Sequence, residues 1–212
     1  MDCFIKLCVR ELPIIGSIRD LSADNTSLWA LPVSAAFGNI EMLPQPTQEM
    51  FENNLAVELL AKSNKINPGD NGSPSSNIIW VEDESQRIGN LNVPNSFWNN
   101  MRNSPVYFLE IDFEKRLDNI CKEYGVFSLA KLAEATVRIH KRLGPNETKK
   151  TLGFLEQGNI REAFRILLNY YDKHYIKGLH NRNELGKLLT ILPCQEVTPD
   201  NSRLLETLYL PI

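Results

Sequence analysis

Two short apolar runs constrain this fold more than any other feature of the sequence. Ile78 to Val81 form one run, and the segment PVYFLEI (105–111) forms the other. Continuous apolar runs of this length are typical of strands buried in a parallel sheet. Segments with helical periodicity precede, separate and follow them. The order helix, strand, helix, strand, helix predicts an α/β fold whose parallel sheet is connected by crossover helices.

The chain beyond Gly125 is predicted to be entirely helical. Apolar residues recur there every three to four positions, and each segment ends at a glycine, in 128–144, 148–158 and 160–178. Asp112 is a plausible N-cap for the helix that ends at Gly125. A polar loop of Gly, Pro, Ser and Asn (63–77) precedes the first apolar run and is long enough to indicate mobility or function.

Cysteine and histidine spacing gives no sign of a metal site. The cysteines are scattered, no two form a C-x-x-C pair, and the histidines have no partner at the usual zinc spacing. We expect reduced, structural thiols at Cys3, Cys8, Cys121 and Cys194. No apolar run approaches the length of a membrane span, and charges interrupt the amino-terminal residues, so we expect a cytoplasmic protein without a membrane partner.

Charge is distributed unevenly along the chain. Residues 1–130 carry 10 basic and 17 acidic side chains, whereas residues 131–187 carry 12 basic and 6 acidic ones. A basic helical lobe can contact RNA phosphates, although basic helical faces are commonly just solvated. The candidates for RNA contact are Arg138, Lys141, Arg142, Lys149, Lys150, Arg161, Arg165 and Lys173. Tyr170, Tyr171 and Tyr175 lie among the last of these and could stack on bases, but packing against a helical core is the preferred interpretation.

Acidic residues follow the first apolar run. Glu82 and Asp83 stand at the carboxyl end of a predicted strand, where open α/β sheets bind ligands, so they are candidates for binding phosphate or a metal ion. Solvation of a strand end is the competing interpretation. A phosphate loop of the form G-x-x-x-x-G-K-[ST] does not occur in these 212 residues, and no arrangement of nucleophile and base is recognisable.

Three ordered segments together resemble one family, the tRNA 2-selenouridine synthases. The first is AAFGNIEMLPQPTQEMFENNLAVEL (35–59), which is similar to the family's Q-P-[ST]-Q-x-x-F-E-N segment. The second, IWVEDESQRIGNLNVPNSFWNNMRNSPVYFLEID (79–112), is similar to its W-V-E-D-E-S-x-x-I-G segment. The third, KRLGPNETKKTLGFLEQGNIREAFRILLNYYDKHY (141–175), resembles its K-R-L-G and Y-Y-D region. The resemblance covers about residues 35–180.

The resemblance implies an enzyme with a rhodanese-like domain that bears a catalytic cysteine, followed by a P-loop domain. Members of the family replace the sulfur of wobble 2-thiouridine in tRNA by selenium from selenophosphate, through a geranylated intermediate made with geranyl diphosphate. This chain looks like a fragment, most of the second domain, that binds tRNA or phosphate but is not competent alone. A separate chain carrying the rhodanese domain and the phosphate loop is a possible partner.

The family resemblance divides the sequence into three parts. Residues 35–125 are expected to form an incomplete P-loop NTPase-like α/β domain, and residues 126–212 a helical C-terminal region. Residues 1–34 are atypical, because Leu31 to Gly38 depart from the family's N-H-R-G-S-x-F-G, and we hypothesise a shifted reading frame or an alternative start there. Because the first strand of the family's sheet is missing, we expect a marginal or aggregation-prone protein unless residues 1–34 rebuild that strand.

Residues are carried over only where the motifs match. Glu82 and Asp83 would lie near phosphate or metal, while Arg142 and Lys173 would face RNA or phosphate. The resemblance assigns no role to Gln45, Phe51, Glu52 and Asn53. Two other functions stay open, namely a P-loop-like kinase or NTPase remnant and a non-catalytic interaction domain.

Overall fold

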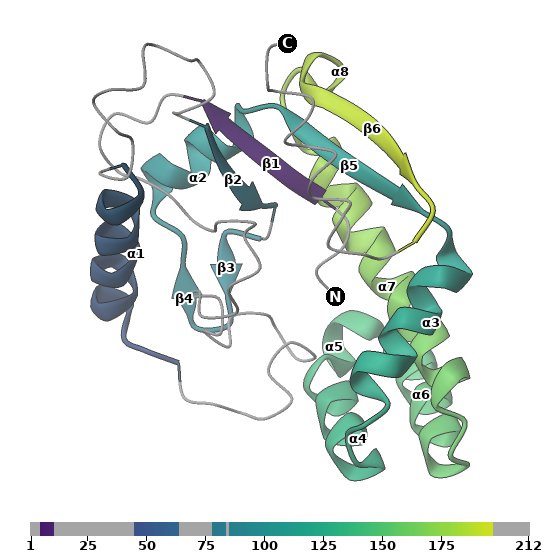
Figure 1. Ribbon diagram of the computed structural model, residues 1–212. Helices are drawn as coiled ribbons and strands as arrows, with labels where there is room; N and C mark the ends of the chain where they lie inside the picture. The colour runs from purple at the N-terminus through teal and green to yellow at the C-terminus, as the bar shows by residue number, and fades with distance from the viewer. Residues whose placement is uncertain (1–4, 11–44, 64–77, 84, 197–212) are drawn as a thin grey trace.

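Figure 1 shows a computed structural model that describes residues 5–10, 45–63, 78–83 and 85–196. One sheet consists of the strands β1 (Ile5–Arg10), β2 (Ile78–Glu82), β5 (Val106–Ile111) and β6 (Leu189–Cys194). Their order across the sheet is β2-β1-β5-β6. The predicted α/β class is confirmed, and both predicted apolar runs form strands.

The orientation of β1 differs from an all-parallel sheet. β5 and β6 pair in parallel, whereas β1 is antiparallel to both of its neighbours, with Leu7 opposite Val81 on one side and Val106 on the other. β2, β5 and β6 therefore run in the same direction, and β1 fills the place between the first two. Residues 5–10 thus supply an interior strand of the sheet. From the sequence, a marginal protein is expected unless residues 1–34 rebuild the missing strand, and β1 provides such a strand.

The prediction of an entirely helical chain beyond Gly125 is wrong at β6. This strand pairs with β5 along its whole length, from Val106 opposite Leu189 to Ile111 opposite Cys194. The segment LLTIL (188–192) is a short apolar run like the two that predicted strands. Pro193 can follow it because, among the described strands, β6 has a partner on one side alone, where a missing N–H group is tolerated.

Two helices and a hairpin pack on the sheet and form the first core. They are α1 (Gln48–Ser63), α2 (Asn95–Arg102) and the antiparallel strands β3 (Arg87–Ile88) and β4 (Leu91–Asn92). Pro94 occupies the N-cap position of α2. The buried residues of the first core are Phe51, Leu55, Val81, Ile88, Leu91, Val93, Phe97, Met101, Val106 and Leu179.

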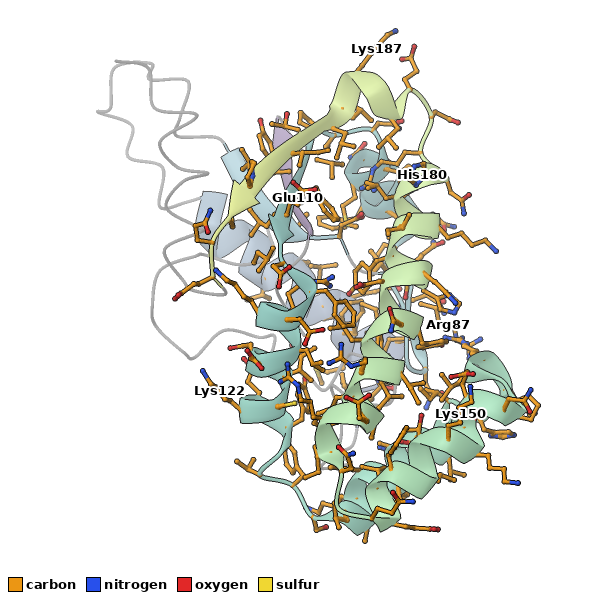
Figure 2. All side chains as sticks on the ribbon, turned by 90° about the vertical axis from the view of Figure 1, so that its right-hand side faces the viewer. Arg87, Glu110, Lys122, Lys150, His180 and Lys187 are labelled. Carbon is orange, nitrogen blue, oxygen red and sulfur yellow. The ribbon has the colours of Figure 1, made fainter. Side chains whose placement is uncertain are left out.

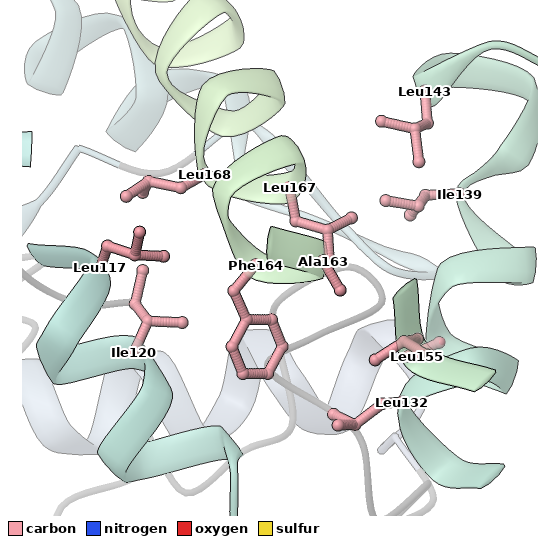
Figure 3. Packing of buried hydrophobic residues seen from close by; sticks show 11 residues of the cluster. Leu117, Ile120, Leu132, Ile139, Leu143, Leu155, Ala163, Phe164, Leu167 and Leu168 are labelled. Atoms are coloured by element: carbon pink, nitrogen blue, oxygen red, sulfur yellow. The ribbon is translucent and has the colours of Figure 1, made fainter. Parts of the chain in front are cut away.

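The helical region has its own core (Figure 3). It is built from α3 (Phe113–Tyr124), α4 (Leu129–Arg138), α5 (His140–Leu143), α6 (Pro145–Glu156) and α7 (Ile160–His180), and the short helix α8 (Leu185–Leu188) leads from α7 into β6. Asp112 is the predicted N-cap of α3 and accepts hydrogen bonds from two backbone N–H groups. The predicted helix 128–144 is divided at Ile139. Phe164 on α7 is 1% exposed at the centre of the second core.

The remaining expectations concern thiols and membranes. Cys121 is half-buried and Cys194 is buried, and burial raises the pKa of both thiols. Cys3 lies outside the described residues. None of the described helices is both long and apolar enough to cross a bilayer.

Candidate functional site

The acidic end of β2 is held by two arginines. Asp83 Oδ2 and Oδ1 accept hydrogen bonds from Arg182 Nη1 and Nη2 at 2.6 and 2.8 Å, and Arg102 Nη1 lies 3.8 Å from Asp83 Oδ1. The side chains of Asp83 and Arg182 are 4% and 0% exposed. Both charges are thus removed from water and paired with each other, a geometry that is strongly destabilised when either partner is lost.

Arg102 extends this contact to a third element. Its Nη2 donates to the carbonyl of Gly178 at 2.8 Å, and its guanidinium lies 5.5 Å from the ring centroid of Trp98. Burial, followed by the charge of Arg182, lowers the pKa of Arg102, while Asp83 opposes the shift. The ion pairs therefore join the end of β2, helix α2 and the last turns of α7.

These contacts do not suit a metal ion at Asp83. Both of its carboxylate oxygens already accept from Arg182, and the part of the chain that the structure describes has no group of three His, Cys, Asp or Glu side chains that could hold one. Glu82 is the last residue of β2, and its side chain lies outside the described part. Phosphate or metal binding by Glu82 and Asp83 stays a prediction, and the described residues do not fit the metal.

Sequence reasoning missed Arg102 and Arg182. The two residues of the main pair, Asp83 and Arg182, are 99 positions apart, so no local spacing connects them. Arg182 also lies just beyond α7, where an arginine is expected to be exposed.

Two glutamines give the Q-P-T-Q motif a role that its sequence left unassigned. Gln45 donates to the carbonyl of Ile88 at 3.0 Å and accepts from the N–H of Asn90 at 2.9 Å. Gln48 donates to the carbonyl of Asn92 at 2.8 Å and accepts from its N–H at 2.9 Å. Each side-chain amide thus makes the pair of backbone hydrogen bonds that a neighbouring strand would make with the β3–β4 hairpin. We call Gln45 and Gln48 together the glutamine clamp.

Gly89 is the residue that the glutamine clamp requires. Its φ of +63° is a left-handed conformation, and a Cβ placed there would lie 2.5 Å from Gln45 Oε1. The other motif residues lie on α1 and, within the described residues, do not contact the hairpin backbone through a hydrogen bond. Phe51 is buried in the first core, Glu52 accepts from Gln48 Nε2 at 2.6 Å, and Asn53 is exposed.

Two of the predicted RNA-binding arginines form ion pairs with carboxylates of the same chain. Arg165 hydrogen-bonds to Glu114 and Glu162, and Arg161 hydrogen-bonds to Glu114 and Asp118. Hydrogen bonds from Arg165, followed by those from Arg161, lower the pKa of Glu114 to about 2 despite an opposing contribution from desolvation. Both arginines therefore fasten α7 to α3, and an RNA role would require them to leave these partners.

The other predicted cations divide into paired and unpaired side chains. Arg138 lies 3.4 Å from Glu134, and Lys150 lies 2.9 Å from Glu147, both as weak pairs at the protein surface. Within the described residues, no hydrogen bond or ion pair engages three exposed lysine side chains, those of Lys141, Lys149 and Lys173. Figure 2 shows Lys150, Arg87, His180 and Lys187 along one side of the molecule, and Lys122 on the opposite side.

Arg142 meets α7 at a small aromatic group. Burial raises the pKa of Tyr170, and the positive charge of Arg142 opposes that rise. The Tyr170 ring centroid lies 4.5 Å from that of His174 and 5.3 Å from that of Tyr171. Tyr170 and Tyr171 pack partly against the second core, and Tyr175 packs against the first. Core packing, the preferred interpretation of the tyrosines, therefore agrees with their placement.

Comparison with known proteins gives a consistent result. Residues 33–185 match the family model described as the tRNA 2-selenouridine synthase AAA domain. A tRNA 2-selenouridine synthase from Bdellovibrio bacteriovorus is 30% identical over 187 residues, covering 70% of this chain and 47% of the relative. One from Cupriavidus pinatubonensis is 28% identical over 197 residues, covering 79% of this chain and 49% of the relative. One from Nitrosomonas eutropha is 40% identical over 93 residues, covering 43% and 21%.

The matches cover only part of each relative. The chain spans about half the length of the curated relatives that it matches over most of its own length. No solved structure matches the chain significantly.

Proposed function

The chain belongs to the family of the tRNA 2-selenouridine synthase AAA domain, and from this premise we propose that it binds tRNA during selenouridine modification. The observation that carries the proposal is the coincidence of this family match with exposed, unpaired lysines in the same residues. Lys141, Lys149 and Lys173 all lie within 33–185. Lysines without internal partners are free to contact backbone phosphates.

The proposed reaction is a group transfer on the wobble uridine of tRNA. Selenium from selenophosphate would replace the sulfur of 2-thiouridine through a geranylated intermediate, with geranyl diphosphate as the donor of the geranyl group. Because the proposed substrate is tRNA, we propose a cytoplasmic location. These details rest on the family and not on any contact in this chain.

We propose that the described residues contribute to binding in this reaction. A thiolate is the nucleophilic form of cysteine, and burial raises the pKa of both Cys121 and Cys194. The 212 residues also contain no phosphate loop of the G-x-x-x-x-G-K-[ST] form. We therefore propose that selenium transfer requires a rhodanese-like domain and a phosphate loop, which a separate chain could supply.

A filter-binding titration with tRNA at several salt concentrations tests the proposal. Each lost phosphate contact reduces the slope of log K against log salt by about 0.7 to 0.9. Joint replacement of Lys141, Lys149 and Lys173 by alanine is expected to reduce the slope by about two units. Lys122→Ala is the matched control, because Lys122 is exposed and Figure 2 shows it on the other side of the view from Lys150, which follows Lys149 in the chain.

Two results would contradict tRNA binding by this surface. One is the absence of salt-dependent binding by the unmodified chain, and the other is an equal effect of Lys122→Ala. Nucleotide binding without tRNA binding would instead favour the kinase or NTPase interpretation. Binding of neither would favour an interaction domain.

A further inference from the structure

The aromatic pair Tyr170–His174 lies on the surface of α7 between positive side chains. The residues are one helical turn apart, and their rings meet at 62° with centroids 4.5 Å apart. Tyr170 is half-buried, whereas His174 is exposed. The pair is thus anchored by one ring in the protein and offers the other ring to solvent.

The charges around this pair are positive. The positive charge of Arg142, on α5, acts on both Tyr170 and His174, and that of Lys177 acts on His174. Lys173 is exposed next to His174 in the chain. Desolvation, followed by the charges of Arg142 and Lys177, lowers the pKa of His174 and so favours its neutral ring. An exposed ring near the charges of Arg142 and Lys177 suits a ligand that combines a flat ring with phosphate charge.

We propose that the Tyr170–His174 pair stacks on an unpaired RNA base, while Arg142, Lys173 and Lys177 contact the phosphates on either side. This site rests on the proposed binding of tRNA and specifies which part of the RNA it takes. Bases inside a double helix are already stacked on each other, so the aromatic pair takes a base of a loop, whereas a duplex contacts the cations alone. Tyr170 packs partly against the second core, and this packing holds the ring that contacts His174 in place.

Binding of two RNA probes separates stacking from phosphate contact. One probe is an RNA hairpin with an unpaired loop, and the other is a blunt RNA duplex with the same number of phosphates. His174→Ala is expected to weaken hairpin binding by about tenfold, since a stacked base contributes about 1–3 kcal/mol. Duplex binding and the salt slope for the hairpin should not change. Lys173→Ala should instead lower the salt slope for both probes.

Matched variants make the outcome specific to the aromatic ring. His174→Phe keeps a stacking surface and should restore hairpin binding. Tyr170→Phe keeps the ring packed in the protein, whereas Tyr170→Ala would also disturb the second core. His180→Ala is the control, because His180 is an exposed histidine on the same helix, and its ring nitrogen contacts the carbonyl of Ile176.

The possible failures are distinct. Wild-type binding to both probes without any selective effect of His174→Ala would overturn the stacking site and leave tRNA binding intact. Failure of His174→Phe to restore binding would overturn it too. Absence of binding to either probe would overturn the proposed function together with the site.

Discussion

The sheet region and the helical region both pair arginines with carboxylates, but they do so in opposite surroundings. At the end of β2, Asp83 and Arg182 are removed from solvent and bound to each other. On α3 and α7, the side chains of Glu114, Arg161 and Arg165 remain 50%, 41% and 32% exposed. The first pair is costly to disturb, whereas water and salt can replace most of the second set.

This difference separates structural charges from charges available to a ligand. In the sheet region, the motif residues Gln45, Gln48 and Asp83 are engaged with backbone or buried side chains. In the helical region, an apolar core holds the helices together and leaves several lysines unpaired. We therefore expect substitutions of the motif residues to change stability, and substitutions of the lysines to change binding.

The largest expected effect comes from breaking the buried pair. Arg182→Ala leaves the Asp83 carboxylate buried with little compensation, so the free energy of unfolding should fall by about 3–5 kcal/mol. Urea denaturation measures this loss. Arg161→Ala is the exposed counterpart and should have a small effect.

A double variant tests the physical cause of that loss. Asp83→Leu combined with Arg182→Met removes both charges and should recover much of the stability. Equal losses for Arg182→Ala and Arg161→Ala would contradict the comparison between the two regions.

The glutamine clamp should give an intermediate effect. Gly89→Ala forces a side chain into a left-handed conformation at a cost of about 1–2 kcal/mol and also brings its Cβ against Gln45. Gln45→Ala removes the obstructing amide, so the two substitutions together should cost less than their sum. Thermal unfolding of the single and double variants measures this coupling.

Gly153→Ala is the control for the glutamine clamp. Gly153 lies within α6, where an added Cβ would meet no atom within 4 Å, and alanine there should stabilise the helix slightly. If the losses of stability caused by Gln45→Ala and Gly89→Ala are strictly additive, the Gln45 amide does not restrict the side chain at position 89.

The smallest expected effect concerns the exposed network. The folded pKa of Glu114 is about 2, below its ordinary value of 4.5, so the carboxylate stabilises the fold above about pH 4.5. That contribution is lost as the pH falls toward 2. Glu114→Gln should therefore flatten the dependence of Tm on pH in this window, while Glu156→Gln, an exposed control, should leave it unchanged. A slope that is the same for all three proteins would exclude a role for the network in stability.

Local patterns predicted the elements whose residues are close in sequence. The apolar runs identified β2 and β5, and Asp112 identified the start of α3. Contacts between distant segments were not predictable in this way. Neither the antiparallel pairing of β1 nor the pairing of Asp83 with Arg182 leaves a periodic signal, because each depends on partners at least 68 residues away, the separation of Arg10 and Ile78.

The site was predictable to a different degree. The position of the acidic residues at a strand end followed from the sequence, but their chemical setting did not, because it depends on Arg182. The basic candidates followed from composition, which could not separate Arg161 and Arg165 from the unpaired lysines. Only the placement of α3 beside α7 makes that distinction.

The strand order also determines when the protein can finish folding. β1 needs partners from residues 78–111, and β5 needs β6 at residues 189–194. The helices of residues 113–180 meet their neighbours through shorter loops, so they can assemble while the ends of the sheet are still apart. During synthesis, β1 must wait for β2 and β5, and β5 must then wait for β6. These intervals expose strand backbone to chaperones and to other chains.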